Sequence, residues 1–320
     1  MRAIARRGRV QLAPIVPVAA VTVPARQPTE NHDVSTATAT LYVVATPIGN
    51  RDDITLRAID VLRGVDRIAA EDTRHSRPLL DHLGIHKPLL ALHEHNEDAA
   101  TRQVLDLLRA GESIALISDA GTPLISDPGF PLVRACRAEG FAVVAVPGPS
   151  ALVAALSVSG LPTDRFRFEG FLPRRQQARM AVLEALRRET ATTVFYESSH
   201  RVLDTVTDMR DVFGADRVLV LARELTKLHE TVLVLPLAGM CERIATDPDQ
   251  QRGECVLLLS GNRTPDEQCL VGVDDLLTML LEELSVKQAA ALAARITGSK
   301  RNMLYQRALA LSADAASKAD

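Results

Sequence analysis

The sequence predicts an α/β protein with two successive α/β domains and a small helical module at the C-terminal end. Short apolar runs of strand length alternate with helical stripes from Leu41 onward, which is the pattern of parallel strands joined by crossover helices. Gly160-Leu161-Pro162 interrupts this alternation, and the pattern beyond residue 263 is entirely helical. We therefore expect α/β domains at residues 41–160 and 161–263 and a helical tail at residues 268–320.

The elements of the first domain follow from its apolar runs and its glycines. Continuous apolar runs predict buried parallel strands at residues 41–45, 67–70, 114–117 and 141–146. Helical stripes lie between them, and Gly111 and Gly140 follow two of these stripes, as residues that end helices commonly do. Ligands of parallel α/β sheets bind at the carboxyl ends of the strands, so the turns at those ends are the candidate binding loops.

The second domain and the tail are predicted in the same way. Strand candidates lie at residues 193–196, 218–222, 231–235 and 255–260, with helices between them. In the tail, one helix begins at Ser285 and ends at Gly298, and another spans residues 302–311. Two short helices around a glycine-containing turn are typical of a small nucleic-acid-binding or docking module.

The composition is that of a soluble globular protein, with 47% hydrophobic and 24% charged residues. No apolar run approaches the roughly 18 to 20 residues of a membrane-spanning helix, so no membrane is expected. The cysteines Cys136, Cys241, Cys255 and Cys269 are scattered and form no C-x-x-C pair. This usage argues against a disulfide framework or a zinc site and indicates a reducing cytoplasm.

Charge is distributed unevenly, although the net charge is only −3. Residues 1–40 carry +3 and residues 285–320 carry +4, so the middle of the chain carries −10. A basic end is compatible with RNA contact and also with an ordinary charged tail. Residues 1–40 combine arginines with a proline-broken apolar run and no clear signal-peptide cleavage pattern, so we expect a disordered extension or an over-long start.

Three turns at predicted strand ends carry the residue types of ligand-binding loops. Residues 45–50 (ATPIGN) lack the G-x-G-x-x-G pattern, so a nicotinamide-dependent enzyme is not indicated. Residues 118–129 hold two Asp, two Gly, two Pro and three hydroxyl residues at a strand end. Residues 146–151 lead into a helix at which Ser150 either caps the backbone or binds a ligand carboxylate.

These turns and four further motifs resemble the tetrapyrrole methylase family. The turns correspond to Thr46-Pro47-Ile48-Gly49, Ala120-Gly121-Thr122-Pro123 and Pro147-Gly148-Pro149-Ser150. The further motifs are residues 71–74 (EDTR), 93–96 (HEHN), 196–201 (YESSHR) and 223–227 (RELTK). With these, the chain is similar to the branch of the family that methylates 16S ribosomal RNA. The likeness runs from about Leu41 to the tail, and the tetrapyrrole branch usually has Asp where this chain has Thr122.

The resemblance implies a fold, a cofactor and a reaction. It implies the tetrapyrrole-methylase fold, with S-adenosylmethionine as methyl donor between the two α/β domains. The implied donor contacts are Pro47, Asp119, Ala120, Gly121, Thr122, Ile125, Ser150, Ala151 and Glu197. The methyl group would pass in line to the ribose 2′-hydroxyl of a cytidine in the decoding region of 16S rRNA, within the small ribosomal subunit. The family also implies a homodimer and needs no metal.

Candidates for accepting the hydroxyl proton are few. Glu71 follows a predicted strand, where active-site residues belong, although an internal ion-pair network with Asp72 and Arg74 is an equal alternative. Lys227 and Glu224 follow another strand, and either can act as a base or hold a phosphate. We take Glu71 and Lys227 as the catalytic candidates.

The candidate RNA contacts are basic residues: Arg74, Arg174, Arg175, Arg201, Lys300 and Arg301. Arg179 extends the cluster at residues 174–175, and such a cluster is more often an ordinary solvated face. Aromatic residues are scarce at 3%, which favours recognition of structured RNA over broad single-strand stacking. His93 and His95 would share one face of a strand, but such histidines are more often surface residues.

Two alternative functions remain open from the sequence. The same fold can methylate a tetrapyrrole such as uroporphyrinogen or a precorrin, which the basic tail and the motif at residues 71–74 argue against. A non-catalytic ribosome-binding or assembly factor can retain the fold, which the intact donor loops argue against.

Overall fold

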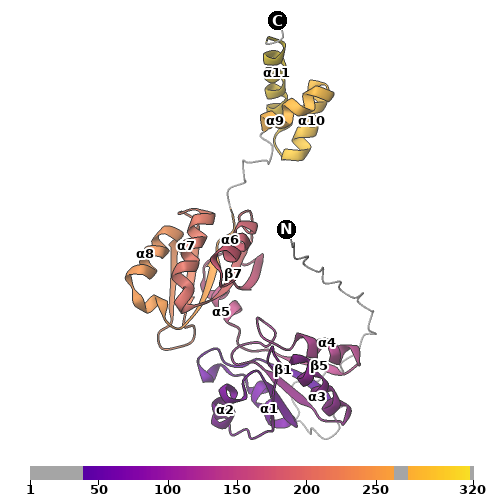
Figure 1. Cartoon of the computed structure of the whole chain (residues 1–320), viewed down its shortest axis with the longest axis vertical. Helices are drawn as coiled ribbons and strands as arrows, with labels where there is room; N and C mark the ends of the chain where they lie inside the picture. The colour runs from indigo at the N-terminus through magenta and orange to yellow at the C-terminus, as the bar shows by residue number, and fades with distance from the viewer. Residues whose placement is uncertain (1–38, 263–272, 318–320) are drawn as a thin grey trace, which may run out of the picture. The chain divides into compact units, whose positions relative to one another are not determined.

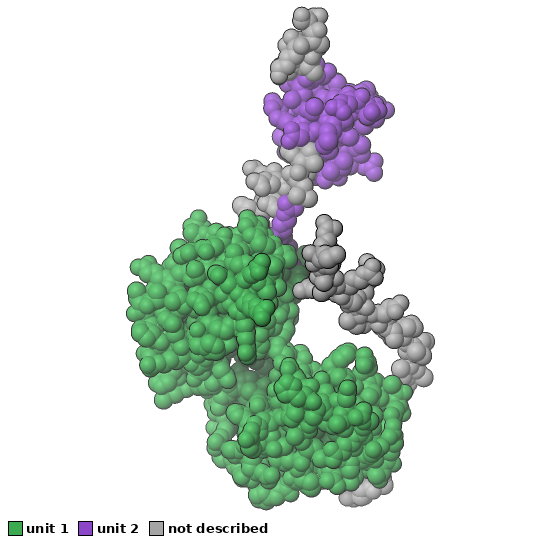
Figure 2. All heavy atoms as spheres, in the orientation of Figure 1, with its two compact units in different colours: residues 1–187, 191–260 green, residues 188–190, 261–320 purple. Residues whose placement is uncertain are grey.

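The computed structural model describes residues 39–262 and 273–317, so most of the expected extension at residues 1–40, and Cys269, lie outside the described residues. The chain forms two compact units, one of residues 1–187 and 191–260 and one of residues 188–190 and 261–320 (Figure 2). The larger unit contains two α/β lobes with a five-stranded sheet each (Figure 1). We call them the N-lobe (residues 39–160) and the C-lobe (residues 161–260).

The N-lobe is a doubly wound parallel sheet, in agreement with the sequence prediction. Its strands are β1 (Thr40–Val44), β2 (Arg67–Ala70), β3 (Leu89–Ala91), β4 (Ile114–Ile117) and β5 (Ala142–Val146). Its helices are α1 (Leu56–Gly64), α2 (Thr73–His82), α3 (Glu97–Arg109), α4 (Phe130–Ala138) and α5 (Ala151–Val158). The strand order is β3-β2-β4-β1-β5 with every pairing parallel. The prediction missed β3, because three residues are too few to show a periodicity.

Strand β4 shows why the predicted strands of this lobe read as continuous apolar runs. Ile114 and Leu116 pack in a core with α3 and α4 on one face of the sheet. Ala115 and Ile117 pack in a second core with α1 and α2 on the other face. Because helices cover both faces, every residue of the strand is buried and no polar alternation survives.

The C-lobe has a mixed sheet. Its strands are β6 (Phe166–Phe171), β7 (Thr192–Ser198), β8 (Val218–Arg223), β9 (Thr231–Pro236) and β10 (Glu254–Leu259), and its helices are α6 (Gln176–Ala185), α7 (Val202–Phe213) and α8 (Leu237–Thr246). The order is β6-β7-β10-β8-β9, in which only β6 and β7 pair in parallel. The prediction missed β6, because this edge strand carries charged residues on an exposed face.

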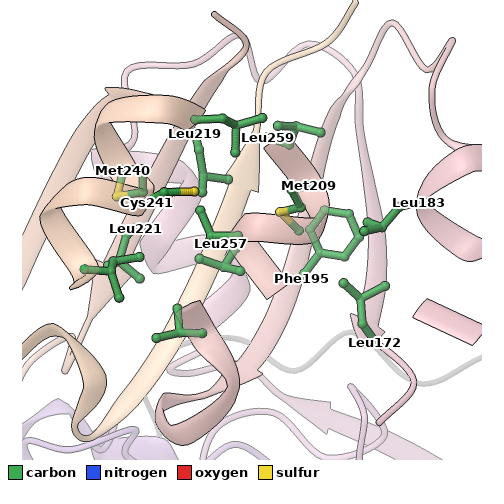
Figure 3. Packing of buried hydrophobic residues seen from close by; sticks show 14 of the residues in the cluster. Leu172, Leu183, Phe195, Met209, Leu219, Leu221, Met240, Cys241, Leu257 and Leu259 are labelled. Atoms are coloured by element: carbon green, nitrogen blue, oxygen red, sulfur yellow. The ribbon is translucent and has the colours of Figure 1, made fainter. Parts of the chain in front are cut away.

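The two faces of the C-lobe sheet bury different partners. One face packs with α6, α7 and α8 in a core that includes Phe195 and Leu257 (Figure 3). The other face packs against the N-lobe, where Val194 and Val220 join Leu152 and Ala155 of α5 in one apolar cluster. Helix α5 is apolar around most of its circumference, so it can serve as the shared wall of the two lobes.

The smaller unit contains three helices among its described residues: α9 (Val273–Glu283), α10 (Val286–Thr297) and α11 (Arg301–Ser317). Leu277, Ala290 and Leu304 meet in its core, one from each helix. The predicted start and end of α10 are confirmed, since Ser285 forms a capping box with the residue at N3 and Gly298 has a φ of 71°. The prediction named two helices and missed α9.

A buried ion pair joins α6 to α7 and corrects one sequence-based assignment. Arg179 Nε donates to Asp208 Oδ2 at 2.6 Å, and the two side chains are only 5% and 3% exposed. Gln176 Nε2 donates to the other carboxylate oxygen at 2.8 Å. The placement of Arg179 in an RNA-facing cluster is therefore wrong, because its guanidinium points into the lobe.

Asp208→Ala should lower the free energy of unfolding by about 3–5 kcal/mol, because it leaves the Arg179 charge buried without an opposite charge beside it. Urea denaturation at pH 7.5 measures this. The matched control is Asp249→Ala, which breaks an exposed pair with Arg252 and should cost less than about 1 kcal/mol. Equal losses for the two variants would contradict the buried-pair assignment.

Candidate functional site

The three predicted binding loops form one connected structure at the carboxyl edge of the N-lobe sheet. The N–H of Thr46 donates to the carbonyl of Gly121 at 2.8 Å, and the Gly121 N–H donates back at 3.0 Å. Thr122 Oγ1 donates to the Pro149 carbonyl at 2.9 Å. Because β1 lies between β4 and β5, the loops that follow these three strands meet, as the topology of such sheets requires.

A cavity of about 500 Å³ lies where these loops face the C-lobe sheet, and a notch between the two lobes is visible in Figure 2. The volume lies within the range of sites for small organic ligands. Among the predicted donor contacts, the lining includes Asp119, Ala120, Gly121, Thr122, Ile125, Ala151 and Glu197, but not Pro47 or Ser150. Of the two catalytic candidates, Glu71 lines the cavity and Lys227 does not.

Three carboxyl groups of the N-lobe share this cavity: Glu71, Asp119 and Asp127. Burial raises the pKa of Glu71, and the negative charge of Asp119 raises it further. Burial also raises the pKa of Asp127 to about 6, with Glu71 and Asp119 adding to the effect and a hydrogen bond with Ser118 opposing it. A site in which the pKa values of Glu71 and Asp127 are raised can accept a proton or hold a cation near neutral pH.

Asp127 is the site residue that sequence reasoning missed. It lies in the predicted ligand-binding loop at residues 118–129, but no motif distinguishes it from the other polar residues of that loop. The backbone provides the missing information, because Leu124 and Ser126 adopt left-handed φ values of 74° and 70°. Such values are costly for residues other than glycine and cluster at functional sites. A folded loop of this kind brings Asp127 to the cavity.

Glu71 and its neighbours at residues 72–74 separate into two roles. Glu71 directly follows β2 and lies in the cavity lining. Asp72 caps α2, accepting from the Arg74 N–H at 2.8 Å, and its backbone N–H donates to Asp119 at 3.1 Å. Arg74 pairs with Asp72 at 3.1 Å and remains 91% exposed. The ion-pair alternative therefore applies to Asp72 and Arg74, whereas Glu71 forms no ion pair with any residue that the structure describes.

Glu197 is a fully buried carboxylate held by its own lobe. It accepts from the Ser198 N–H at 2.8 Å and from Thr205 Oγ1 at 2.6 Å. Arg201 lies 3.5 Å from it and donates to the carbonyls of Leu172 and Pro173 at 2.9 and 3.1 Å. With a side chain only 13% exposed, Arg201 is placed for a structural role rather than for RNA contact.

Lys227 belongs to a network at the joint between the lobes. Its Nζ donates to Glu224 at 2.9 Å and to Glu254 at 3.0 Å. Burial lowers the pKa of Lys227, but these two hydrogen bonds outweigh it and raise the pKa overall. The amine therefore stays protonated. A protonated amine cannot accept a proton, and the geometry favours a positioning role for Lys227 over the role of a base.

The Lys227 loop touches the predicted binding loop of residues 45–50 at Gly49. Thr226 Oγ1 accepts from the Asn50 N–H at 3.0 Å, and Thr226 itself adopts a left-handed φ of 66°. A Cβ atom at Gly49 would lie 2.5 Å from Lys227 Cγ and 2.9 Å from Thr226 Oγ1. A side chain at this position would push the Lys227 and Thr226 side chains aside, so the two lobes are latched here by close approach of these side chains to the Gly49 backbone.

The remaining candidates lie outside the cavity lining. Ser150 precedes α5 but makes no side-chain cap, so the capping alternative for its hydroxyl is wrong. It hydrogen-bonds Tyr196, whose hydroxyl accepts from the Leu152 N–H at 3.2 Å. His93 and His95 follow β3 in a turn rather than a strand, with ring centres 6.1 Å apart.

The predicted RNA contacts divide by exposure. Arg174 and Arg175 are exposed before α6, and Lys300 and Arg301 are exposed at the start of α11. Across the described ranges 39–262 and 273–317, no three His, Cys, Asp or Glu side chains are grouped as a metal site would require. None of the helices in the same ranges is both long and apolar enough to cross a membrane.

Comparison with known proteins gives consistent results. Residues 40–241 match the family described as tetrapyrrole (corrin/porphyrin) methylases, and residues 271–312 match the RsmI C-terminal HTH domain. The chain is 56% identical over 272 residues to the ribosomal RNA small subunit methyltransferase I of Pseudomonas aeruginosa, covering 84% of this chain and 96% of that protein. It is 50% identical over 269 residues to the protein of the same name from Escherichia coli O157:H7, covering 84% and 94%.

Solved structures show the same fold at low identity. A diphthine synthase covers 69% of this chain and 90% of its own, with a TM-score of 0.55 and 16% identity. The methyltransferase CobJ covers 71% and 97%, with a TM-score of 0.53 and 18% identity.

Asp127→Asn should change stability in a pH-dependent way. Because folding raises the pKa of Asp127 from 3.8 to about 6, the folded state binds the proton more tightly than the unfolded chain. This stabilisation is complete below pH 3.8 and is lost as the pH rises through about 6. Wild type should therefore lose on the order of 2 kcal/mol relative to Asp127→Asn between pH 4 and 7.5. Denaturant unfolding of both proteins tests this, and a constant difference would refute the shift.

Gly49→Ala should weaken ligand binding in the cavity by roughly tenfold, because the methyl group pushes the Lys227 and Thr226 side chains aside and shifts the predicted binding loop of residues 45–50. Calorimetric titration with S-adenosylhomocysteine measures the effect. Gly239→Ala is the matched control, since a Cβ at that helical position meets nothing within 4 Å. Unchanged affinity in Gly49→Ala would show that the latch does not shape the cavity.

Proposed function

The chain belongs to the tetrapyrrole methylases and, within them, to the ribosomal RNA small subunit methyltransferases I, and on this premise we propose its donor, substrate and reaction. It transfers a methyl group from S-adenosylmethionine to the ribose 2′-hydroxyl of a cytidine in the decoding region of 16S rRNA, within the small ribosomal subunit. Near full-length identity of 56% to a ribosomal RNA methyltransferase supports the substrate class. The acidic cavity at the sheet edge is the structural observation that carries the proposal.

The cavity suits the proposed donor in size and charge. S-adenosylmethionine carries a sulfonium cation, and Glu71, Asp119 and Asp127 surround the space with carboxyl groups. The loop that contains Gly121 and Thr122 brings backbone close to the cavity, where Gly121 has a φ of 83°. We assign the donor to Asp119, Ala120, Gly121, Thr122, Ile125, Ala151 and Glu197 as direct neighbours, with Pro47 and Ser150 supporting them from the adjoining loops.

Glu71 is the proposed acceptor of the hydroxyl proton. As the ribose oxygen bonds to the methyl carbon, the carbon–sulfur bond breaks, the sulfur keeps that electron pair, and the hydroxyl proton passes to the Glu71 carboxylate. Burial raises the pKa of this group, which makes it a stronger base than an exposed glutamate. Lys227 is proposed as a positioning residue that packs closely against Gly49 of the N-lobe, while its ion pairs with Glu224 and Glu254 inside the C-lobe keep it protonated.

RNA contact is proposed for exposed cations on both units. Arg74, Arg174, Arg175, Lys300 and Arg301 are exposed and can bind phosphate. The sequence from residue 284 to 313 contains no Asp or Glu, so α10 and the first three turns of α11 present only positive charge. Arg201 already donates to a backbone carbonyl of its own lobe, and we propose that it supports Glu197 instead of binding RNA.

A homodimer is proposed from the family and from exposed apolar side chains. Leu56 and Val153 are among the large hydrophobic residues of the larger unit that remain exposed. Contiguous apolar patches mark interaction surfaces, so a partner copy that covers these residues is the arrangement we propose. Light scattering after size exclusion gives the oligomeric state directly.

Glu71→Gln should lower kcat by roughly 10²- to 10⁴-fold, because the amide cannot accept the proton. The assay is transfer of tritium from labelled S-adenosylmethionine to small ribosomal subunits that lack the modification, followed by nucleoside analysis. The Kd for S-adenosylhomocysteine, which lacks the sulfonium charge, should remain within about threefold of wild type, since Gln keeps the shape of Glu. Label in 2′-O-methylcytidine is the expected product for the wild-type protein.

The control for this variant is Glu94→Gln, an exposed acid near Glu71 that does not line the cavity and should leave kcat unchanged. Full activity in Glu71→Gln would remove Glu71 from the mechanism. Absence of label in RNA, with transfer to uroporphyrinogen instead, would replace the proposed substrate by a tetrapyrrole.

A further inference from the structure

Phe171 is an aromatic ring left uncovered in the cavity wall. It is the last residue of β6, it lines the cavity, and 55% of its surface is exposed. Tyr196, the neighbouring aromatic of the same lining, is packed into the apolar cluster between the lobes. A large apolar side chain that stays exposed within a ligand cavity indicates a surface that a bound molecule covers.

A β-bulge turns this ring toward the cavity. Phe168 pairs with Val194 of β7 and Phe171 pairs with Tyr196, so three steps along β6 match two steps along β7. In a regular strand, residues three apart point to opposite faces of the sheet. The extra residue instead places Phe168 and Phe171 on one face, where both rings contact Tyr196. Bulges beside active sites commonly re-aim a side chain in this way.

The ring packs edge to face against its aromatic neighbour. Its centre lies 5.6 Å from that of Tyr196 at an interplanar angle of 63°, and Tyr196 in turn meets Phe168 at 4.9 Å and 69°. These are edge-to-face contacts, which leave the flat face of an aromatic ring available for stacking. The Tyr196 hydroxyl is anchored by the Leu152 N–H at 3.2 Å. Residues of both lobes therefore support the position of Phe171.

The bulge also abuts the loop that carries Asp127. A Cβ atom at Gly170 would lie 3.1 Å from Ser126 Oγ, and Gly170 has a left-handed φ of 66°. Phe171 and Asp127 follow these two touching residues directly, and both line the same cavity. A planar ligand on the ring would therefore have a carboxyl group within the same enclosure.

We propose that Phe171 is a stacking platform for the pyrimidine base of the nucleotide whose ribose is methylated. A nucleotide modified inside a folded RNA must leave its stack, and aromatic side chains hold such unstacked bases. Asp127 supplies a carboxylate that can accept a hydrogen bond from the amino group of a cytosine, which is the pairing that acids make with this base. The inference rests on the proposed function, and it names the subsite that the substrate base occupies.

The position of the ring favours the substrate over the donor as its occupant. Almost all proposed donor contacts come from the N-lobe loops, whereas Phe171 comes from the edge strand of the C-lobe sheet. The donor is a small molecule that the cavity can enclose, but an RNA base must reach the site while attached to a large substrate. The more exposed of the two aromatic rings in the lining is the one such a base can reach.

Phe171→Trp gives a direct binding test, because the chain has no other tryptophan. The full-length variant, loaded with S-adenosylhomocysteine, is titrated with cytidine 5′-monophosphate while its fluorescence is recorded. Stacking should give saturable quenching. The control ligand is 5,6-dihydrouridine 5′-monophosphate, whose ring is not aromatic and should quench at least tenfold more weakly. Equal quenching by both ligands would overturn the proposal.

Phe171→Leu tests the contribution to the reaction. It keeps an apolar side chain but removes the flat ring, so the KM for small ribosomal subunits should rise roughly 10- to 100-fold while the donor Kd stays constant. Phe171→Tyr should restore the wild-type KM. Phe166→Leu is the matched control, because Phe166 is 48% exposed on the same strand and does not line the cavity.

Three further results would overturn the proposal. A donor Kd that rises in step with KM would assign the ring to the donor's adenine, and unchanged KM in Phe171→Leu would leave the ring without a role. Absence of quenching in Phe171→Trp, while the wild-type protein methylates rRNA, would reject the platform and leave the proposed function intact. Conversely, selective quenching by cytidine monophosphate without any rRNA methylation by wild type would support the platform and reject the proposed function.

Discussion

The apolar contact between helix α5 and the C-lobe sheet is the interaction on which the rest of the site depends. Leu152, Ala155 and Leu156 of α5 lie in one cluster with Val194, Val220, Val256 and Leu258 of the C-lobe strands. Burial of this surface stabilises the joint by roughly 25 cal/mol for each Å² of apolar area removed from water. The cavity borders this joint, and Ile125, Ala151 and Tyr196 belong to both. The packing that joins the two lobes therefore also encloses the cavity.

Enclosure determines the chemistry of the carboxyl groups. Burial is the largest cause of the raised pKa values of Glu71 and Asp127, so both shifts depend on keeping water out of the cavity. Burying carboxyl groups costs free energy, and two hydrogen bonds partly offset that cost. The Asp72 N–H donates to Asp119, and Ser118 forms a hydrogen bond with Asp127. Left-handed residues in the same loop add backbone strain, which packing elsewhere must hold in place. The packing between the two lobes therefore holds this acidic loop in its strained conformation.

How much of this could be foreseen depends on the range of each interaction. The strands β1, β4 and β5 and the caps of α10 were predicted because a few adjacent residues dictate them, as the Ser285 capping box and Gly298 illustrate. The edge strands β3 and β6 were missed because short or charged edge strands lack an apolar run. Arg179 was misassigned because its partner, Asp208, lies on another helix, and nothing near Arg179 in the sequence indicates that it is buried. Asp127 was overlooked for a related reason, since its environment is made by Ser118, Glu71 and Asp119.

The sequence by itself determined the alternating α/β pattern, the parallel N-lobe sheet, the loops at its carboxyl edge and the segregation of positive charge in the tail. These properties are local, since they depend on apolar periodicity, turn residues and composition within short windows. The tertiary structure decided which polar groups are buried, which ion pairs form and which rings stay exposed. It placed Lys227 in an ion pair with Glu224 and bonded Arg201 to backbone carbonyls of its own lobe. It also directed Phe171 into the cavity through a β-bulge. Such outcomes depend on residues distant in the chain, because burial and charge coupling arise only when separate elements pack together.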